Sequence, residues 1–259
     1  ARLGGERRHM TISFADLIGF TALSESVSPE KLTEILACYL EILTAQVADN
    51  QGTVDKFNGD DVMSFWGAPL PVQDHSFLAC LAAIKARREL ESKTLEWLEK
   101  GIPRLRVSWG IATGEVVVGN VGSHERMNYT VIGDTVNLAS RLQGINRMYE
   151  TEILISAAAK DACGDRIVSR LVDWVVPLGK ENAVEIHELV GLTGEVDLSW
   201  DSVLEHYEEA LNEIARRDWD KAETSLKKVL RLRPEDGPSR TMMKRLARYR
   251  VKPPEPDWD

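Results

Sequence analysis

Three short segments of the sequence carry residue types that could do chemistry together. The first is FADLIGFT, in which Asp16 follows an apolar run and precedes a glycine-containing turn. A carboxylate beside exposed backbone N–H groups suits a hydrated Mg²⁺ ion that is bound together with substrate phosphates. An acidic residue that merely starts a turn would explain this segment equally well.

The second segment, KFNGDD, places Asp60 and Asp61 at the expected turn of a β-hairpin. Acidic residues are common in turns, so turn chemistry alone could account for both of them. Lys56 lies four residues before Asp60. In an ideal hairpin with a two-residue turn their side chains would point to opposite faces, so the two residues need not contact the same ligand molecule.

The third segment, YTVIGDTVNLASRL, places Asn137 and Arg141 four residues apart on an expected helix, where they share one face. An amide and a guanidinium displayed together could hold a ribose and a phosphoryl group, because arginine matches phosphate oxygens in a fork. The alternative is a solvated helix face, which is the commoner explanation for an arbitrary Asn/Arg pair.

The elements that must position these residues alternate between short apolar strands and amphipathic helices. Helices are expected from Ser28-Pro29-Glu30, from Asp74 to about residue 100, after Gly133-Asp134 and over 157–163, and a hairpin is expected around Asn58-Gly59. Further strands are expected near residues 10–14, 105–111, 115–118, 127–132, 152–155, 170–176 and 184–190. This order predicts an α+β fold, with a ferredoxin-like or palm-type antiparallel sheet and helices on one face.

The character of the sequence changes after Gly194, so we place a domain boundary near residue 195. Residues 1–195 form the expected α+β domain, and residues 196–259 form a small helical tail that resembles a single tetratricopeptide-type helix pair. The matching positions are Ala210, Ala222, Leu226 and Pro234. Because about three such repeats are usually needed for stability, we expect the tail to pack on the main domain or to continue into further sequence.

The composition is that of a globular protein, since 43% of the 259 residues are hydrophobic and 28% are charged. The net charge of −9 argues against a nucleic-acid partner. No apolar run approaches the roughly 18 to 20 residues of a membrane span, and no signal peptide opens the sequence. Three distant cysteines without a CxxC motif indicate neither a disulfide framework nor a zinc site, so we expect a reducing, cytoplasmic setting.

The two ends of the sequence suggest a piece of a longer protein. The chain begins without a methionine and ends in the proline-rich stretch VKPPEPDWD. We therefore expect an upstream sensory or membrane domain in the full-length protein, and a membrane domain would place this otherwise cytoplasmic chain at the cytoplasmic face of the membrane.

Taken together, the motifs resemble the catalytic domain of class III nucleotide cyclases over residues 8–190. The matching stretches are ISFADLIGFTALSE, VDKFNGDDVMSFWG, VSWGIATGEVVVGNVG, YTVIGDTVNLASRL and PLGKENAVEIHEL. The resemblance implies that Asp16, Asp60 and the backbone carbonyl of Leu17 bind two Mg²⁺ ions, for which Mn²⁺ can substitute. It also implies that Asn137 orients the ribose and that Arg141 stabilises charge in the transition state.

The same resemblance assigns residues that contact the substrate. Lys180 matches a lysine that contacts the terminal phosphates, and Lys56 and Thr130 stand at the two positions that select the base. Aspartate is common at the second position, and threonine there resembles a bacterial subgroup of which some members respond to bicarbonate. Lysine can donate to adenine N1 but cannot accept from guanine N1–H, so Lys56 favours ATP. The residues that match the phosphate-contacting loop are Gly19, Phe20 and Thr21.

The function implied by the resemblance is that of an adenylate cyclase, which converts ATP to 3′,5′-cyclic AMP and pyrophosphate by a two-metal mechanism. In the family each active site is shared between two chains, and this one sequence contains the residues of both halves. A homodimer with two equivalent sites is therefore expected. Two alternatives remain, a guanylate cyclase and a catalytically silent cyclase-like module for sensing or dimerisation. The silent module would lack metal or transition-state residues, and none is missing.

Overall fold

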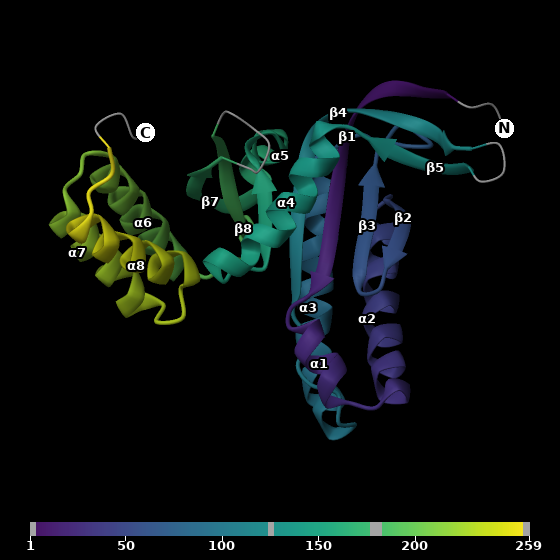
Figure 1. Cartoon of the computed structure of the whole chain (residues 1–259), viewed down its shortest axis with the longest axis horizontal. Helices are drawn as coiled ribbons and strands as arrows, with labels where there is room; N and C mark the ends of the chain where they lie inside the picture. Colours follow the sequence, from purple (N-terminus) through teal and green to yellow (C-terminus); the bar gives the residue numbers. More distant parts are fainter. Residues whose placement is uncertain (1–3, 124–126, 177–182, 256–259) are drawn as a thin grey trace.

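A computed structural model describes residues 4–123, 127–176 and 183–255, and Figure 1 shows how their helices and strands are arranged. The strands are β1 (Gly4–Leu17), β2 (Thr53–Asn58), β3 (Asp61–Trp66), β4 (Val107–Gly122), β5 (Met127–Ile132), β6 (Ile153–Ser156), β7 (Ile167–Val175) and β8 (Val184–Leu192). The helices are α1 (Phe20–Ser26), α2 (Pro29–Asp49), α3 (His75–Glu99), α4 (Asp134–Tyr149), α5 (Ala157–Cys163), α6 (Ser199–Ala215), α7 (Trp219–Leu232) and α8 (Gly237–Val251). None of the described helices combines the length and hydropathy that a membrane-spanning segment needs.

The strands form one sheet in the order β2-β3-β1-β4-β6-β8-β7, and β5 pairs with the far end of β4. The β4–β6 ladder is parallel, and the other ladders of the described residues are antiparallel. The expected α+β class with a mainly antiparallel sheet is therefore confirmed.

Helices cover both faces of the sheet, rather than the one face that we expected. Figure 1 shows α4 on the near side and α2 and α3 behind the sheet. The central strands are apolar on both faces, since Trp109 and Ile111 of β4 belong to one buried cluster while Ala112 and Val116 belong to the other. A strand that is buried on both sides needs a layer of helices on each.

Local sequence signals explain where the first elements begin and end. Ser28 caps α2, because its side chain accepts a hydrogen bond from the Lys31 N–H at 3.3 Å. The hairpin turn consists of Gly59 and Asp60, one residue later than expected, since Asn58 already pairs with the first residue of β3. Gly59 has a φ of 69°, a left-handed conformation that glycine adopts without steric cost.

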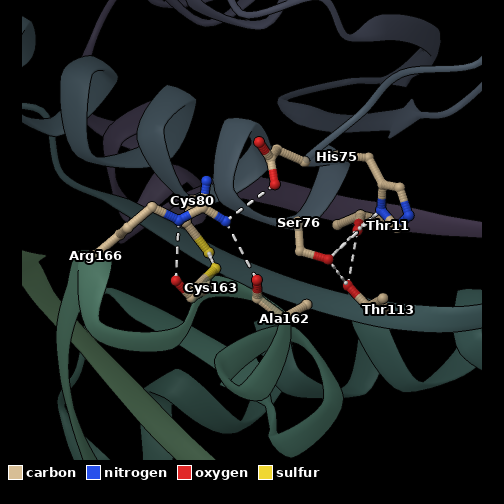
Figure 2. Close-up of polar contacts among 9 residues, drawn as sticks. Thr11, His75, Ser76, Cys80, Thr113, Ala162, Cys163 and Arg166 are labelled. Carbon is tan, nitrogen blue, oxygen red and sulfur yellow. Dashed lines mark hydrogen bonds and ion pairs between the residues drawn. The ribbon is translucent and has the colours of Figure 1, made fainter.

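A buried polar cluster fixes the start of α3 against the sheet (Figure 2). Thr11 Oγ1 of β1 lies 2.7 Å from His75 Nδ1 and 2.7 Å from Thr113 Oγ1 of β4, and Ser76 Oγ lies 2.9 Å from Thr113 Oγ1. Burial lowers the pKa of His75 and therefore favours the neutral ring. The hydroxyl groups satisfy one another inside the core, so this cluster has a structural explanation.

Asp74, the residue at which α3 was expected to start, forms an ion pair rather than a helix cap. Asp74 makes no side-chain cap hydrogen bond, and its carboxylate instead pairs with Arg166 at 3.2 Å. Arg166 also donates to the carbonyl of Cys163 at the end of α5, and the Cys163 and Cys80 sulfurs lie 3.7 Å apart (Figure 2). These contacts join α3 to α5 on the same face of the sheet.

The C-terminal segment forms three helices, one more than the pair that the spacing of the sequence indicates. In Figure 1 they lie at the β7 edge, at the opposite end of the sheet from β2. Val203 and Tyr207 of α6 belong to the same buried cluster as Val172 of β7, and the Tyr207 hydroxyl donates to the Val172 carbonyl at 2.9 Å. The third helix starts where Asp236 accepts a hydrogen bond from the Ser239 N–H at 3.0 Å.

A buried ion-pair network also anchors the tail. Arg170 of β7 is 5% exposed and pairs with Glu188 of β8 at 2.6 Å and with Asp236 of the tail at 2.5 Å. Although burial opposes it, the Arg170 guanidinium holds the pKa of Asp236 below its ordinary value. The rings of Trp200 and Tyr207 lie beside the same guanidinium. The tail and the sheet therefore share polar as well as apolar buried contacts.

The start of α8 contacts the end of α4 directly. A Cβ added to Gly237 would lie 2.1 Å from the backbone oxygen of Tyr149, and Thr241 donates to the carbonyl of Met148 at 3.0 Å. Arg245 pairs with Asp173 at 2.6 Å and donates to the Tyr149 hydroxyl at 3.1 Å. The tail thus holds the last turn of α4 in place.

We expect Gly237→Ala to lower the free energy of unfolding by about 2–4 kcal/mol, because the new methyl group forces α8 away from the end of α4. Urea-induced unfolding measures the change. Gly144→Ala is the matched control, since an added Cβ there meets nothing within 4 Å, and it should be neutral or stabilising by up to about 1 kcal/mol. Equal stability of Gly237→Ala and the unmodified chain would contradict the close packing.

Candidate functional site

Two carboxylates come together where the end of β1 meets the turn between β2 and β3. The β1–β3 ladder is antiparallel and pairs Ala15 with Val62, so the last residues of β1 lie beside the turn that precedes β3. Asp16 lies at this end of β1, and Asp60 lies in the turn. The Leu17 N–H donates to Asp60 Oδ2 at 3.2 Å. The structure thus brings together the three residues expected to bind metal.

Helix α2 holds the turn in place from the side of the core. The hydroxyl of Tyr39, which is fully buried, donates to the backbone carbonyl of Asp60 at 2.9 Å. Burial and the nearby carboxylates of Asp16, Asp60 and Asp61 raise the pKa of Tyr39 well above its ordinary value. The neutral hydroxyl is therefore a stable donor to the turn.

Three neighbouring carboxylates at this site, those of Asp16, Asp60 and Asp61, repel one another. Burial, a hydrogen bond to Asp60 and the charges of Asp60 and Asp61 raise the pKa of Asp16 to about 8. Burial and Asp60 also raise the pKa of Asp61. Among the described residues, none forms an ion pair with any of these three carboxylates. A divalent cation with a preference for oxygen ligands would relieve this repulsion, so the donor set fits Mg²⁺.

The same carboxylates could hold a metal only with help from other ligands. The described residues contain no group of three or more His, Cys, Asp or Glu side chains that could hold an ion by themselves. A cation at Asp16 and Asp60 would therefore need a backbone carbonyl, water molecules or substrate phosphates to complete its coordination.

The turn after β1 leads directly into a short helix beside the carboxylates. Gly19 has a φ of 83°, which allows the chain to leave β1 and to begin α1 at Phe20. Gly19 and Thr21 are exposed, and Phe20 is half-buried and packs against the core beneath α2 and α3. The loop expected to contact phosphate groups is thus placed next to Asp16.

Helix α4 presents the expected Asn137 in its first turn and Arg141 one turn later, at the middle of the helix. Asn137 is exposed and Arg141 is half-buried. Within the described part of the chain, neither side chain has a hydrogen-bond or ion-pair partner. An amide and a guanidinium that are free to bind, one turn apart, could contact a sugar hydroxyl and a phosphoryl group.

Close backbone packing fixes α4 on the sheet. A Cβ added to Gly110 of β4 would lie 2.1 Å from the backbone oxygen of Ala139, so the helix and the strand touch without side chains between them. Asn146 on the same helix donates to the carbonyl of Trp109 at 2.8 Å. Gly110 and Asn146 thus determine where Asn137 and Arg141 lie.

A short chain of hydrogen bonds links α4 to β1, the strand that carries Asp16 and is called the carboxylate strand below. Gln143 donates to Ser108 Oγ at 2.6 Å, and the Ser108 hydroxyl donates to the backbone carbonyl of Asp16 at 3.2 Å. Gln143 and Ser108 are not among the residues predicted from the sequence, because their contact depends on how α4 packs on β4. No local pattern in the sequence indicates it.

The two residues expected to select the base lie together beside a third residue. Thr130 of β5 donates to Asp55 Oδ2 at 2.8 Å, and Lys56 Nζ lies 3.2 Å from the same oxygen. Asp55 is not among the residues predicted from the sequence, since neighbouring residues on a regular strand point to opposite faces. A bulge between Val54 and Lys56 changes this alternation.

The predicted residues can be sorted by the half of a shared site that the family resemblance gives to each of them. One group comprises Asp16, Asp60 and the loop after β1, and the other comprises Lys56, Thr130, Asn137 and Arg141. In the described part of the chain, no hydrogen bond or ion pair directly joins a side chain of one group to a side chain of the other. Lys180 lies outside the described residues.

The region that contains these residues matches a known protein family. The family model described as the adenylate and guanylate cyclase catalytic domain matches residues 5–169. "Adenylate cyclase 1" of Rhizobium meliloti (strain 1021) is 38% identical over 191 residues, which cover 74% of this chain and 29% of that protein. The chain thus spans less than a third of the length of this curated relative.

Two solved structures resemble the chain to a similar extent. The adenylyl cyclase CyaB from P. aeruginosa superposes with a TM-score of 0.69 and 34% identity, over 75% of this chain and 100% of that one. The guanylyl cyclase Cya2 superposes with a TM-score of 0.67 and 34% identity, over 76% of this chain and 98% of that one. Overall similarity therefore does not separate the two substrates. Because the family model covers most of the chain and includes both groups of site residues, the chain belongs to the family of adenylate and guanylate cyclase catalytic domains.

Proposed function

We propose that this chain is an adenylate cyclase that converts ATP to 3′,5′-cyclic AMP and pyrophosphate. The observation that carries this proposal is a complete set of functional residues in a cyclase fold. Asp16 and Asp60 form a carboxylate pair without a balancing cation, and Asn137 and Arg141 are free of intramolecular partners among the described residues. The named adenylate cyclase relative supports the choice of ATP, as does the donor-only side chain of Lys56.

The carboxylates are the part of the chain that would hold metal. Asp16, Asp60 and the Leu17 carbonyl would bind two Mg²⁺ ions, or Mn²⁺ in their place. When bound, such ions neutralise triphosphate charge and lower the pKa of the ribose 3′-hydroxyl. Between substrates, burial and the repulsion among the carboxylates raise the pKa of Asp16 and disfavour its ionised form, so an incoming cation competes with a proton there.

The remaining residues bind and orient the nucleotide. The loop of Gly19, Phe20 and Thr21 contacts the phosphates, and Asn137 holds the ribose so that its 3′-oxygen faces the α-phosphorus. Arg141 donates to the α-phosphoryl oxygens, where negative charge develops in the transition state. The ribose 3′-hydroxyl gives its proton to solvent water and its oxygen bonds to the α-phosphorus. The bond between the α-phosphorus and the oxygen that bridges to the β-phosphorus breaks, and pyrophosphate leaves with that oxygen.

A shared site is supported by the lack, among the described residues, of any hydrogen bond or ion pair between the side chains of the carboxylate group and those of the other group. We infer that two copies of the chain form a homodimer, in which the carboxylates of one copy face Lys56, Thr130, Asn137 and Arg141 of the other. A symmetric arrangement of this kind creates two equivalent sites. The link from Gln143 through Ser108 to the Asp16 carbonyl would then connect the two sites, because it joins the α4 of one site to the carboxylate strand of the other.

A guanylate cyclase is the second candidate, since the structure of guanylyl cyclase Cya2 is 34% identical to this chain. Lysine has no lone pair with which to accept the guanine N1–H, so Lys56 disfavours GTP. Direct competition between ATP and GTP in one assay distinguishes the two candidates. A catalytically silent module is disfavoured because each functional residue type is retained.

We also propose that the tail positions the catalytic helix. The first turns of α4 carry Asn137 and Arg141, whereas its last turn contacts α8 through Tyr149. Because a helix transmits displacement along its axis, movement of α8 would move the catalytic side chains. This proposal treats the residues after 195 as part of the enzyme and not as a separate module.

Replacing Asp16 or Asp60 by asparagine should lower the rate of cyclic AMP formation by at least about 10²-fold, because the metal loses a charged ligand. Each change removes like-charge repulsion, so the unfolding temperature without metal should not fall. Asp161→Asn on the exposed surface of α5 is the control and should leave the rate unchanged. An unchanged rate in Asp16→Asn or Asp60→Asn would refute their assignment.

Mixing two inactive variants tests the shared site. Asp16→Asn and Arg141→Ala should each be inactive alone, yet a refolded equimolar mixture should recover about a quarter of the unmodified activity. Half of randomly formed dimers are mixed, and each of these contains one intact site out of two. The control is Asp16→Asn protein that is refolded in the same way without the second variant, and it should stay inactive. Inactivity of a mixture that demonstrably contains mixed dimers would contradict a shared site.

Removing the residues after 195 should lower the unfolding temperature and reduce kcat by about 10-fold or more, because α4 loses the contacts that hold its last turn. The KM for ATP should change little, since β2 and β5 remain intact. Steady-state kinetics and thermal unfolding measure these effects. Unchanged dimerisation, stability and rate would show that the tail has no such role.

A further inference from the structure

We propose that Asp55 determines the preference for adenine by fixing the direction of the hydrogen bond that Thr130 makes. The inference rests on the proposed adenylate cyclase function and deepens it. A threonine hydroxyl can donate one hydrogen bond and can also accept, so by itself it suits both adenine and guanine. Something else must therefore decide which of these roles it offers to the base.

The contact between Thr130 and Asp55 removes the ambiguity. Thr130 is 8% exposed, the side chain of Asp55 is 3% exposed, and Thr130 Oγ1 lies 2.8 Å from Asp55 Oδ2. An ionised carboxylate only accepts hydrogen bonds, so the hydroxyl of Thr130 must donate its single hydrogen to Asp55. The lone pairs of the hydroxyl then remain for a ligand, and Thr130 acts as an acceptor.

The ammonium group of Lys56 keeps Asp55 in this role. Lys56 Nζ lies 3.2 Å from the same Asp55 oxygen that accepts from Thr130. The bulge in β2 places Asp55 outside the regular alternation, which lets two successive side chains approach each other. Asp55 thus contacts both base-selecting residues, one as an ion pair and the other as a hydrogen-bond acceptor.

The resulting pattern matches adenine and opposes guanine. Adenine presents an acceptor at N1 and a donor at its 6-amino group, which complement the donor Lys56 and the acceptor Thr130. Guanine presents a donor at N1 and an acceptor at O6. The donor Lys56 would then face a second donor, and the acceptor Thr130 would face a second acceptor. If Thr130 were free to rotate its hydrogen, it could donate to guanine O6 and remove half of this mismatch.

The test compares kcat/KM for ATP and for GTP in the full chain with Mn²⁺. Asp55→Asn keeps the shape of the side chain, but its amide can donate to Thr130 and free the threonine hydrogen. We expect the ratio of ATP to GTP efficiency to fall by about 10–100-fold, the usual effect of one buried polar mismatch. Asp55→Ala removes the acceptor altogether and should have the same effect, so the test does not depend on one variant.

Two double variants separate hydrogen-bond direction from a general loss of structure. Thr130→Asp in the Asp55→Asn background supplies an acceptor of its own and should restore the preference for ATP. In a Thr130→Val background there is no hydroxyl to orient, so Asp55→Asn should not change the ratio further. Asp161→Asn is the matched surface control and should leave both the ratio and the unfolding temperature unchanged.

The outcomes distinguish this inference from the proposed function. If the unmodified chain forms no cyclic AMP from ATP, the proposed function itself fails. If the unmodified chain is active but Asp55→Asn lowers the efficiency for ATP and GTP equally, Asp55 is only structural and the inference is overturned. The inference is also overturned if adding Thr130→Asp to Asp55→Asn does not restore the ratio of ATP to GTP efficiency, although the double variant unfolds at the same temperature as Asp55→Asn alone.

Discussion

The packing of α4 on β4 is the constraint on which the rest of the structure depends. Strand β4 pairs with β1, β5 and β6 and is buried on both faces, so its position determines the layers on either side. At Gly110 the strand and the helix touch backbone to backbone. Because α4 carries Asn137 and Arg141, a contact that stabilises the core also aims the two side chains that would face a substrate.

The carboxylate site illustrates how function opposes stability. Burial and mutual repulsion make Asp16 hard to ionise, and the fold tolerates this because Tyr39 and the Leu17 N–H hold the turn at Asp60. Such stored repulsion is costly to the folded chain without a cation, yet it favours cation binding. The buried Arg170 network, by contrast, balances its charges internally and serves to join the tail to the sheet.

Hydrogen-bond direction is a second means by which the fold sets chemistry. A threonine and a lysine define little about a base until their partner is known, because one can donate or accept and the other is mobile. Asp55 contacts both and is itself nearly enclosed. If Lys56 and Thr130 face the base as proposed, a residue that contacts no substrate would determine which substrate fits, because it restricts its two neighbours.

The sequence by itself determined the family and most of the elements, and it predicted the four residues Asp16, Asp60, Asn137 and Arg141 as functional. These follow from local patterns, since strand ends, turns and helix faces are defined by spacing within a few residues. Only the tertiary structure decided that Thr130 meets Asp55, 75 residues away, and that Gln143 reaches Ser108. It also decided that helices cover both faces and that the tail holds α4. Ladder register, a bulge and backbone contact at glycines produce these features, and none of them leaves a periodic signal in the sequence.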